Sequence, residues 1–147
     1  MDITNIDKSE YQAVVDIWEA SVRATHHFLP ETDIQFFRPL ILNEYLSAVE
    51  LRCARDEEGT IVGFLGVADG NIEMLFLHPD TFGKGVGKLL LNCALNEFKC
   101  TKVDVNEDNH NAVAFYKHMG FEVVSRAETD PLGKPYPILH MELGKVI

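Results

Sequence analysis

The most constraining feature of this chain is the stretch Ile72–Leu91, which combines a strand, a glycine-rich loop and the start of a helix. Residues 72–77 are mostly apolar and predict a buried β-strand, which the run His78-Pro79-Asp80 ends. An amphipathic pattern running to residue 98 predicts the helix. The loop between them reads Gly83-Lys84-Gly85-Val86-Gly87-Lys88. A glycine loop placed between a strand and a helix is suited to holding phosphate.

The physical basis of this prediction is the start of the helix. Its first backbone N–H groups have no partner within the helix, and the aligned peptide dipoles leave partial positive charge there. Glycines remove the Cβ atoms that would keep a phosphate away from these donors. Lys84 and Lys88 add positive charge, although the chain of 147 residues has a formal net charge of −10. A cationic loop in an acidic protein indicates a specific anion rather than general polyanion binding.

The spacing of the glycines distinguishes between known phosphate loops. The nucleoside-triphosphate loop G-x-x-x-x-G-K-[ST] fails, because Phe82 stands at its first glycine and Leu89 at its hydroxyl residue. The dinucleotide fingerprint G-x-G-x-x-G fails at Lys88. The stretch resembles instead the acyl-CoA-binding segment of the GNAT family of N-acetyltransferases, whose pattern [QR]-x-x-G-x-[GA] falls on residues 82–87. Both glycines match, whereas Phe82 replaces Gln or Arg, which bears on ligand affinity more than on family identity.

A second pattern lies further along the chain. The letters Asn109-x-x-Ala112-x-x-Phe115-Tyr116-x-x-x-Gly120-Phe121 are similar to the second GNAT pattern at every fixed position. Finding both patterns in the expected order is stronger than finding either alone. The specific resemblance therefore covers residues 63–121, and the rest of the chain follows it in outline.

The order of the expected elements predicts an α+β fold. Strands are expected over residues 2–6, 50–56, 60–68, 72–77, 101–105, 122–127 and 137–143. Helices are expected over residues 7–25, 31–46, 88–98 and 112–119, with a kink or a break at Pro39. This order predicts a central mixed, mostly antiparallel sheet of six to seven strands flanked by about four helices, the GNAT-like arrangement. Residues 1–147 are expected to form a single domain.

Composition excludes several classes of protein. Apolar residues make up 46% and charged residues 24%, and no apolar run approaches the ~20 residues that span a bilayer. The start of the chain has neither a basic nor an apolar signal segment, so we expect a cytoplasmic protein without a membrane partner. The negative net charge argues against nucleic acid. Edge strands near the C-terminus offer a route to a homodimer.

Neither the cysteines nor the histidines are spaced as metal ligands are. The three cysteines lack C-x-x-C spacing, and the six histidines lack H-x-x-x-H spacing. We therefore expect no metal.

The resemblance implies which residues hold acetyl-CoA, the expected co-substrate. Backbone groups of the strand would contact the pantetheine arm, the glycine loop would surround the pyrophosphate, and residues of the second pattern would complete the site. The expected ligand-binding residues are Leu75, Phe76, Leu77, Gly83, Lys84, Gly85, Val86, Gly87, Lys88, Asn109, Phe115 and Tyr116. Asn109 is also placed to cap the following helix, and both roles can hold at once.

Acetyl transfer from a thioester to an amine needs a base and an acid. The amine must lose a proton, because an alkyl ammonium has a pKa near ~10.4. Glu73 is the first candidate for the base, and a solvent-facing position on an alternating strand is an equal alternative. His26 or His27 could replace it. The resemblance implies that a backbone N–H near Leu75 stabilises the developing oxyanion and that Tyr116 protonates the departing thiolate.

The resemblance implies that the variable segment between the first two strands shapes the acceptor site, which we expect within residues 26–46. His26, His27 and Phe28 are candidates for lining it, although His26 could simply cap a helix end and His27 face solvent. Tyr136 follows an expected loop of prolines and glycine and would either touch substrate or pack at a strand entrance.

The predicted function is therefore transfer of the acetyl group of acetyl-CoA to a primary amine. The acceptor could be a small molecule, a peptide N-terminus or a lysine side chain. The alternative is a GNAT-fold acyl-CoA-binding sensor or regulatory module without turnover.

Overall fold

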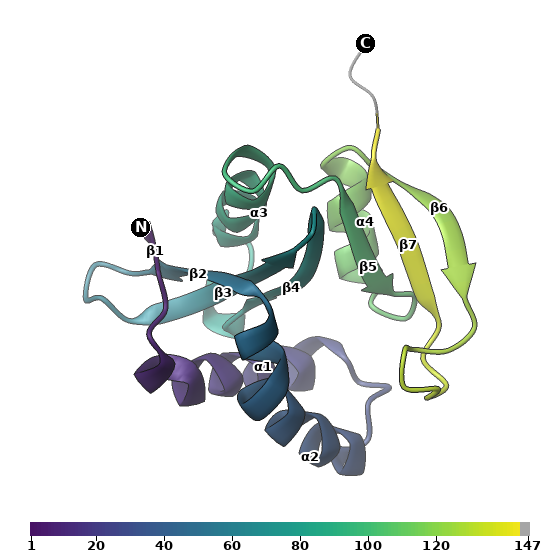
Figure 1. Ribbon diagram of the computed structural model, residues 1–147, viewed down its shortest axis with the longest axis horizontal. Helices are drawn as coiled ribbons and strands as arrows, with labels where there is room; N and C mark the ends of the chain where they lie inside the picture. Colours follow the sequence, from purple (N-terminus) through teal and green to yellow (C-terminus); the bar gives the residue numbers. More distant parts are fainter. Residues whose placement is uncertain (145–147) are drawn as a thin grey trace. The chain divides into compact units, whose positions relative to one another are not determined.

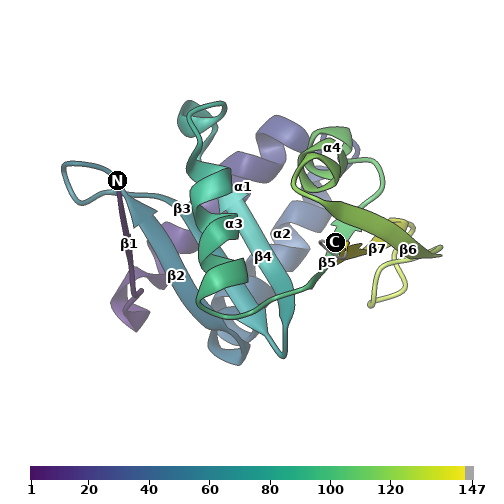
Figure 2. The same cartoon turned by 90° about the horizontal axis from the view of Figure 1, so that it is seen from above.

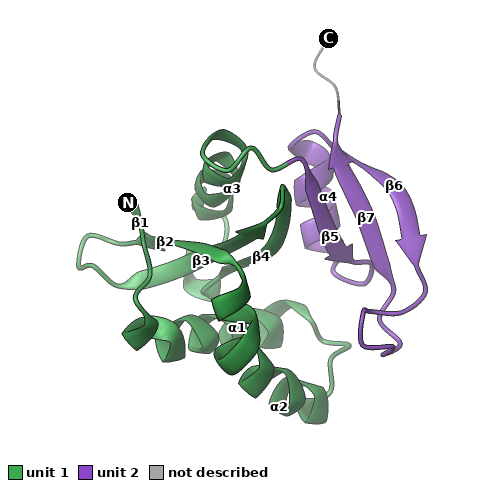
Figure 3. Ribbon diagram, in the orientation of Figure 1, with its two compact units in different colours: residues 1–100 green, residues 101–147 purple. Residues whose placement is uncertain are grey.

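The computed structural model describes residues 1–144, and these divide into two compact units. The first unit is Met1–Cys100 and the second begins at Thr101 (Figure 3). Each unit is described below by itself. The expectation of one domain over residues 1–147 stays a prediction, and its last three residues lie outside the described part of the chain.

The first unit contains four strands and three α-helices, joined by short irregular turns (Figure 1). Its strands are β1 (Asp2–Thr4), β2 (Glu50–Arg55), β3 (Ile61–Ala68) and β4 (Asn71–Leu77). Its α-helices are α1 (Tyr11–Thr25), α2 (Glu31–Leu40) and α3 (Val86–Asn96). Its shorter helical turns are η1 (Lys8–Glu10), η2 (Ile41–Tyr45), η3 (Leu46–Ala48) and η4 (Pro79–Thr81).

The four strands of the first unit form an antiparallel sheet in the order β1-β2-β3-β4. α1 packs on β3 and β4 from one side of this sheet, and α3 packs on β2, β3 and β4 from the other (Figures 1 and 2). Gly63 allows the α3 side to pack closely, because a Cβ there would lie 3.2 Å from Cδ1 of Leu90 and 2.8 Å from Cδ2 of Leu77.

The main hydrophobic core lies between α1, α2 and the sheet. The side chains of this core are apolar residues that lie at helical spacing on α1 and at alternate positions on the strands. Its fully buried members include Val14, Val15, Leu46, Cys53 and Phe64. The first helical segment begins as predicted, because Oε1 of Glu10 accepts from the backbone N–H of Asp7 at 3.1 Å.

The second predicted helix is interrupted, and Pro39 explains where. α2 contains Pro39 in its last turn, and the chain then continues as the π-helical turn η2 and the 3₁₀ turn η3. A proline has no N–H to donate to the preceding turn and crowds the carbonyl there, so the regular ladder is disturbed. The predicted kink or break at this residue is confirmed.

β4 carries an irregularity that the sequence did not reveal. Met74 pairs with Gly66 and Ile72 pairs with Val67, so Glu73 is an extra residue in a β-bulge. Simple alternation would place Ile72 and Met74 on one face of the sheet. Because directly paired residues share a face, the bulge places them on opposite faces and leaves Glu73 between them.

The second unit contains a three-stranded antiparallel sheet and one α-helix. Its elements are β5 (Lys102–Asn106), α4 (His110–His118), β6 (Phe121–Ala127) and β7 (Ile138–Leu143). β7 lies between β5 and β6, and α4 packs on β5 and β6. β6 is therefore an outer strand of this sheet, and its Val123 and Val124 are exposed. A homodimer through such an edge stays a prediction.

Residues 1–144 thus contain seven β-strands and four α-helices, and every pairing within either unit is antiparallel. The predicted α+β class and the predicted number of elements are confirmed. In this same part of the chain, no helix combines the length and the apolar character that a membrane crossing needs.

Candidate acetyl-CoA site

The glycine loop adopts the conformation that its residues permit. Gly83 has φ 76° and Gly85 has φ 82°, both in the left-handed region that residues with a Cβ rarely adopt. An added Cβ at either position would meet nothing within 4 Å. The glycines are therefore required by the backbone path and leave open space over the loop, rather than filling a crowded site.

The loop leads into the N-terminus of α3, where the first backbone N–H groups have no hydrogen-bond partner within the helix. Gly85 is the N-cap, and the first bond of the helix runs from the N–H of Leu89 to the oxygen of Gly85 at 3.0 Å. The amides between these two residues precede this first helical bond. Lys84 and Lys88 are exposed beside them. This arrangement can bind a pyrophosphate through backbone N–H groups and two flexible cations.

The 3₁₀ turn η4 leads into the glycine loop, and it was not predicted from the sequence. Nδ1 of His78 accepts from the N–H of Asp80 at 3.1 Å, and the hydroxyl of Thr81 donates to the oxygen of His78 at 2.7 Å. Pro79 occupies the first position of this 3₁₀ turn, where its missing N–H costs nothing. The letters His78-Pro79-Asp80 carried this signal, because a polar cap before a proline is typical of a helix start.

The strand that precedes the loop is held in place by its neighbour. Leu75, Phe76 and Leu77 pair with Leu65, Phe64 and Gly63 of β3. The Phe76 ring lies 5.8 Å from that of Phe64, on the core side of the sheet. These contacts make β4 a rigid support for backbone groups that would contact a pantetheine arm.

The candidate base Glu73 is exposed at the bulge of β4. Burial raises the pKa of the Cys100 thiol, and the negative charge of Glu73 raises it further. Because Glu73 is exposed, the burial that would make it an effective carboxylate base is absent from this structure. Bulges often re-aim a side chain next to an active site, and this one explains why Glu73 departs from the alternation of its strand.

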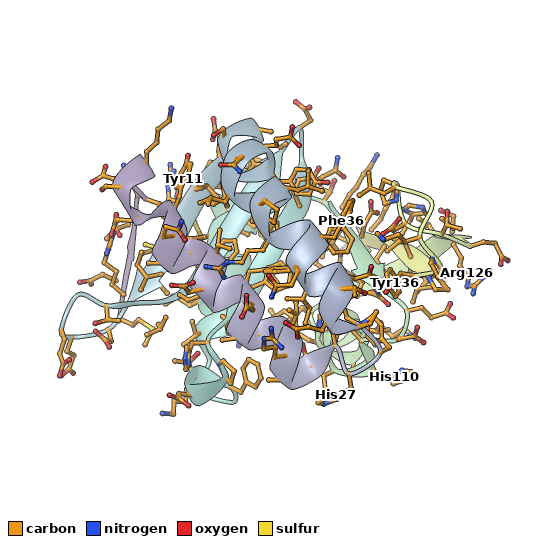
Figure 4. The ribbon with its side chains drawn as sticks, turned by 90° about the horizontal axis from the view of Figure 1, so that it is seen from below. Tyr11, His27, Phe36, His110, Arg126 and Tyr136 are labelled. Atoms are coloured by element: carbon orange, nitrogen blue, oxygen red, sulfur yellow. The ribbon has the colours of Figure 1, made fainter. Side chains whose placement is uncertain are left out.

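The paired histidines lie at the end of α1 and differ in environment. His26 is the C-cap, its N–H donates to the oxygen of Val22 at 2.7 Å, and its Nδ1 lies 2.7 Å from the Thr25 hydroxyl oxygen. Burial, assisted by His27, lowers the pKa of His26 to about 4. His27 is exposed (Figure 4). In the alternative considered for these two residues, His26 caps the helix end and His27 faces solvent, and this matches their positions in the structure.

Phe28 belongs to the same turn. It is half-buried, and its ring lies 5.2 Å from that of His26. The three candidates for the acceptor site, His26, His27 and Phe28, are therefore brought together by one turn after α1.

The second pattern lies wholly in the second unit and builds α4. Oδ1 of Asn109 accepts from the N–H of Ala112 at 3.3 Å, so the predicted N-cap is confirmed. Tyr116 is buried, with its ring 5.2 Å from Phe115 and 5.5 Å from Phe121, both edge to face. Burial raises the pKa of Tyr116 above its ordinary value near 10. The phenol therefore stays protonated at neutral pH.

Tyr136 is buried immediately before β7, and its N–H donates to the oxygen of Lys134 at 2.8 Å. A buried ring is consistent with packing at the strand entrance, the second of the two roles considered for it. Within residues 1–144, no three His, Cys, Asp or Glu side chains gather as metal ligands would.

The fold and the glycine loop together are typical of an acyl-CoA-dependent acyltransferase. The family model described as "Acetyltransferase (GNAT) domain" matches residues 29–137, so the chain belongs to the GNAT acetyltransferases. It is an N-acetyltransferase that transfers an acetyl group to an amine, as predicted. The binding-only alternative loses its support.

Particular relatives share nearly the whole chain. The peptidyl-lysine N-acetyltransferase YjaB of Salmonella typhimurium is 38% identical over 140 residues, which are 93% of this chain and 96% of that protein. The solution structure of apo-form YjaB from Escherichia coli superimposes with a TM-score of 0.88 at 36% identity, covering 99% of this chain and 98% of that one.

A more distant structure shows the fold alone. The PaiA N-acetyltransferase of Thermoplasma acidophilum, solved in complex with coenzyme A, gives a TM-score of 0.72 at 18% identity, covering 96% of this chain and 98% of that one.

Proposed function

We propose that this protein acetylates the side-chain amine of lysine in peptides or proteins, with acetyl-CoA as the acetyl donor. The observation that carries the proposal is the 38% identity to a peptidyl-lysine N-acetyltransferase over nearly the full length of both chains. The acidic character of this chain, with a formal net charge of −10, supports an acceptor that carries positive charge.

The first unit supplies the grip on the acetyl donor in this proposal. The amides at the start of α3, with Lys84 and Lys88, bind the pyrophosphate. Backbone groups of Leu75–Leu77 hold the pantetheine arm along β4, and an N–H near Leu75 donates to the thioester oxygen. The bound thioester supplies the activated acetyl group.

The second unit supplies the proton that the leaving group needs. Tyr116 donates its phenolic proton to the departing thiolate, since burial keeps that phenol protonated at neutral pH. Asn109, besides capping α4, offers its amide to the pantetheine arm, and Phe115 supports the Tyr116 ring.

Glu73 is the base that we propose for the acceptor amine, acting directly or through water. His26 is the poorer choice, because burial lowers the pKa of its imidazole to about 4 and its Nδ1 lies 2.7 Å from the Thr25 hydroxyl oxygen, whereas Glu73 is exposed to an incoming amine. His27 remains the alternative, since it is exposed in the turn where the acceptor is expected. His26 and Phe28 then shape that turn, and Tyr136 supports the loop before β7.

The acceptor is tested with a mixture of three amines in equal amounts. The first is a peptide with a blocked N-terminus and one lysine, the second is a peptide with a free N-terminus and arginine in place of that lysine, and the third is a polyamine. Mass spectrometry after incubation with acetyl-CoA identifies which amine gains an acetyl group. We expect the lysine peptide to be acetylated first. Preferential acetylation of either other amine would refute the lysine assignment while leaving the enzyme class intact.

A further inference from the structure

Phe82 is the one position at which the glycine loop departs from its family pattern, and the proposed function does not use it. The residue ends the turn η4, with its N–H donating to the oxygen of Pro79 at 3.1 Å. Its side chain is 40% exposed. A single exposed aromatic residue is ordinary on a protein surface, so exposure alone carries no argument.

The exposed Phe82 lies close in the chain to the start of α3. Only Gly83 and Lys84 separate it from the N-cap Gly85, so its Cα lies within about 11 Å of the Cα of Gly85 at full extension. The two glycines leave open space above the backbone. In CoA a single ribose joins the pyrophosphate to adenine. A pyrophosphate held at the start of α3 therefore brings the base within reach of this ring.

Phe in place of Gln or Arg limits which part of a nucleotide the side chain at position 82 can contact. Gln or Arg can donate hydrogen bonds to phosphate oxygens, and Phe cannot. A benzene ring offers the nucleotide a flat apolar face, and bases stack on such faces. Stacking would also remove from water a ring that the protein itself leaves exposed.

We propose that the Phe82 ring stacks on the adenine base of CoA, so that this protein recognises the nucleotide by a base contact where its family uses a polar side chain. The inference rests on the proposed function of the loop as the pyrophosphate site. It implies that the adenosine part of CoA contributes to affinity through Phe82, whereas the pantetheine part does not depend on this residue.

Two ligands and two variants separate these contributions. Isothermal titration measures CoA and 4′-phosphopantetheine, which lacks the adenosine 3′,5′-bisphosphate part of CoA, against the wild-type protein, Phe82→Ala and Phe36→Ala. Phe36 on α2 is 45% exposed and lies outside the loop, so the second variant removes a ring of similar exposure elsewhere.

The expected result is a selective loss. Phe82→Ala should weaken CoA binding by about 5- to 100-fold and change 4′-phosphopantetheine binding by less than about twofold. Phe36→Ala should change neither. Equal weakening of both ligands by Phe82→Ala would mean that the residue shapes the loop, and an unchanged CoA affinity would mean that the ring does not touch the base. Either result overturns the inference while the proposed function stands.

A second variant tests the contact itself. Phe82→Trp keeps an aromatic face and adds a fluorophore, and the chain's single tryptophan, Trp18, is buried in the core as a constant background. CoA should quench the new fluorescence and 4′-phosphopantetheine should not. Equal quenching by both ligands contradicts base stacking. If the wild-type protein binds neither ligand, the proposed function fails and the inference fails with it.

Discussion

Tyr116 shows how one residue can be both structural and chemical. Its ring packs edge to face against Phe115 and Phe121, and the same burial raises the pKa of its hydroxyl. A phenol with a raised pKa keeps its proton at neutral pH and is a weaker acid than an ordinary phenol. The packing interpretation and the general-acid interpretation of this residue therefore describe the same environment.

Replacing Tyr116 by Phe should remove the proton donor and keep most of the packing. We expect kcat to fall by roughly 10²- to 10⁴-fold, the ordinary contribution of a general acid. The affinity for acetyl-CoA should change by less than about threefold, since the hydroxyl acts only on the leaving group. Steady-state kinetics and titration with CoA measure the two quantities. Unchanged turnover would exclude Tyr116 as the acid.

If Glu73 is the base, the loss of kcat on its replacement should depend on pH. Glu73→Gln should lower kcat by about 10²-fold at pH 7, because the acceptor lysine is then almost wholly protonated and needs a base. The deficit should shrink as the pH rises toward the lysine pKa near ~10.4, where solution supplies the free amine. A deficit that stays constant from pH 7 to pH 10 would contradict the base assignment, and His27→Gln would then be the next variant to measure.

The lowered pKa of His26 predicts that the free energy of unfolding depends on pH. Its pKa is about 4 in the folded protein and ~6.5 when unfolded, so the unfolded chain binds a proton first as the pH falls. The stability that the neutral imidazole provides is complete above pH ~6.5 and is lost progressively toward pH ~4, by about 1–3 kcal/mol. Urea unfolding at pH 7 and pH 5 should show this slope in wild type and a smaller slope in His26→Gln. The exposed neighbour provides the control, because His27→Gln should keep most of the slope.

At the scale of elements, the glycine loop and the bulge of β4 differ in how far the sequence could reveal them. The glycines of the loop were expected to leave its backbone open to a phosphate, and their left-handed backbone angles fit that expectation, because glycine adopts such angles freely. The bulge at Glu73 could not be predicted, since it results from pairing with residues 66–67 of β3, and no local pattern encodes a register shift. The bulged position of Glu73 therefore needed the structure, whereas the open glycine loop did not.

Other elements follow the same division. The cap at Asn109 and the break at Pro39 depend on neighbours within a few residues and were predicted. The position of β7 between β5 and β6 depends on contacts between distant residues, so the order of expected strands left it open. The buried environment of Tyr136 likewise comes from tertiary packing.

Two glycines with matching geometry test the loop as an element. Gly85 has φ 82° at the start of α3, Gly59 has φ 80° in the turn between β2 and β3, and an added Cβ at either meets nothing within 4 Å. Either Gly→Ala change should lower the free energy of unfolding by about 1–2 kcal/mol through backbone strain alone. Only Gly85→Ala should also weaken acetyl-CoA binding, by about tenfold or more, because its Cβ enters the phosphate site. Equal affinities for the two variants would contradict the assignment of the loop.

At the scale of the whole molecule, an acidic chain carries two exposed lysines in one short glycine loop. The net charge of −10 disfavours polyanions, and we propose that Lys84, Lys88 and the amides at the start of α3 bind a compact pyrophosphate. Binding of acetyl-CoA should therefore depend on the shape of the whole ligand and not on negative charge alone.

Thermal unfolding with and without excess acetyl-CoA tests this claim most directly, with ATP and NAD as nucleotide controls. A ligand that binds only the folded state at about 100 times its Kd stabilises it by ~2.7 kcal/mol, which raises the unfolding midpoint. We predict that acetyl-CoA raises the midpoint and that neither control does. A shift with ATP or NAD and none with acetyl-CoA would contradict the account, because the glycine loop would then serve a different nucleotide.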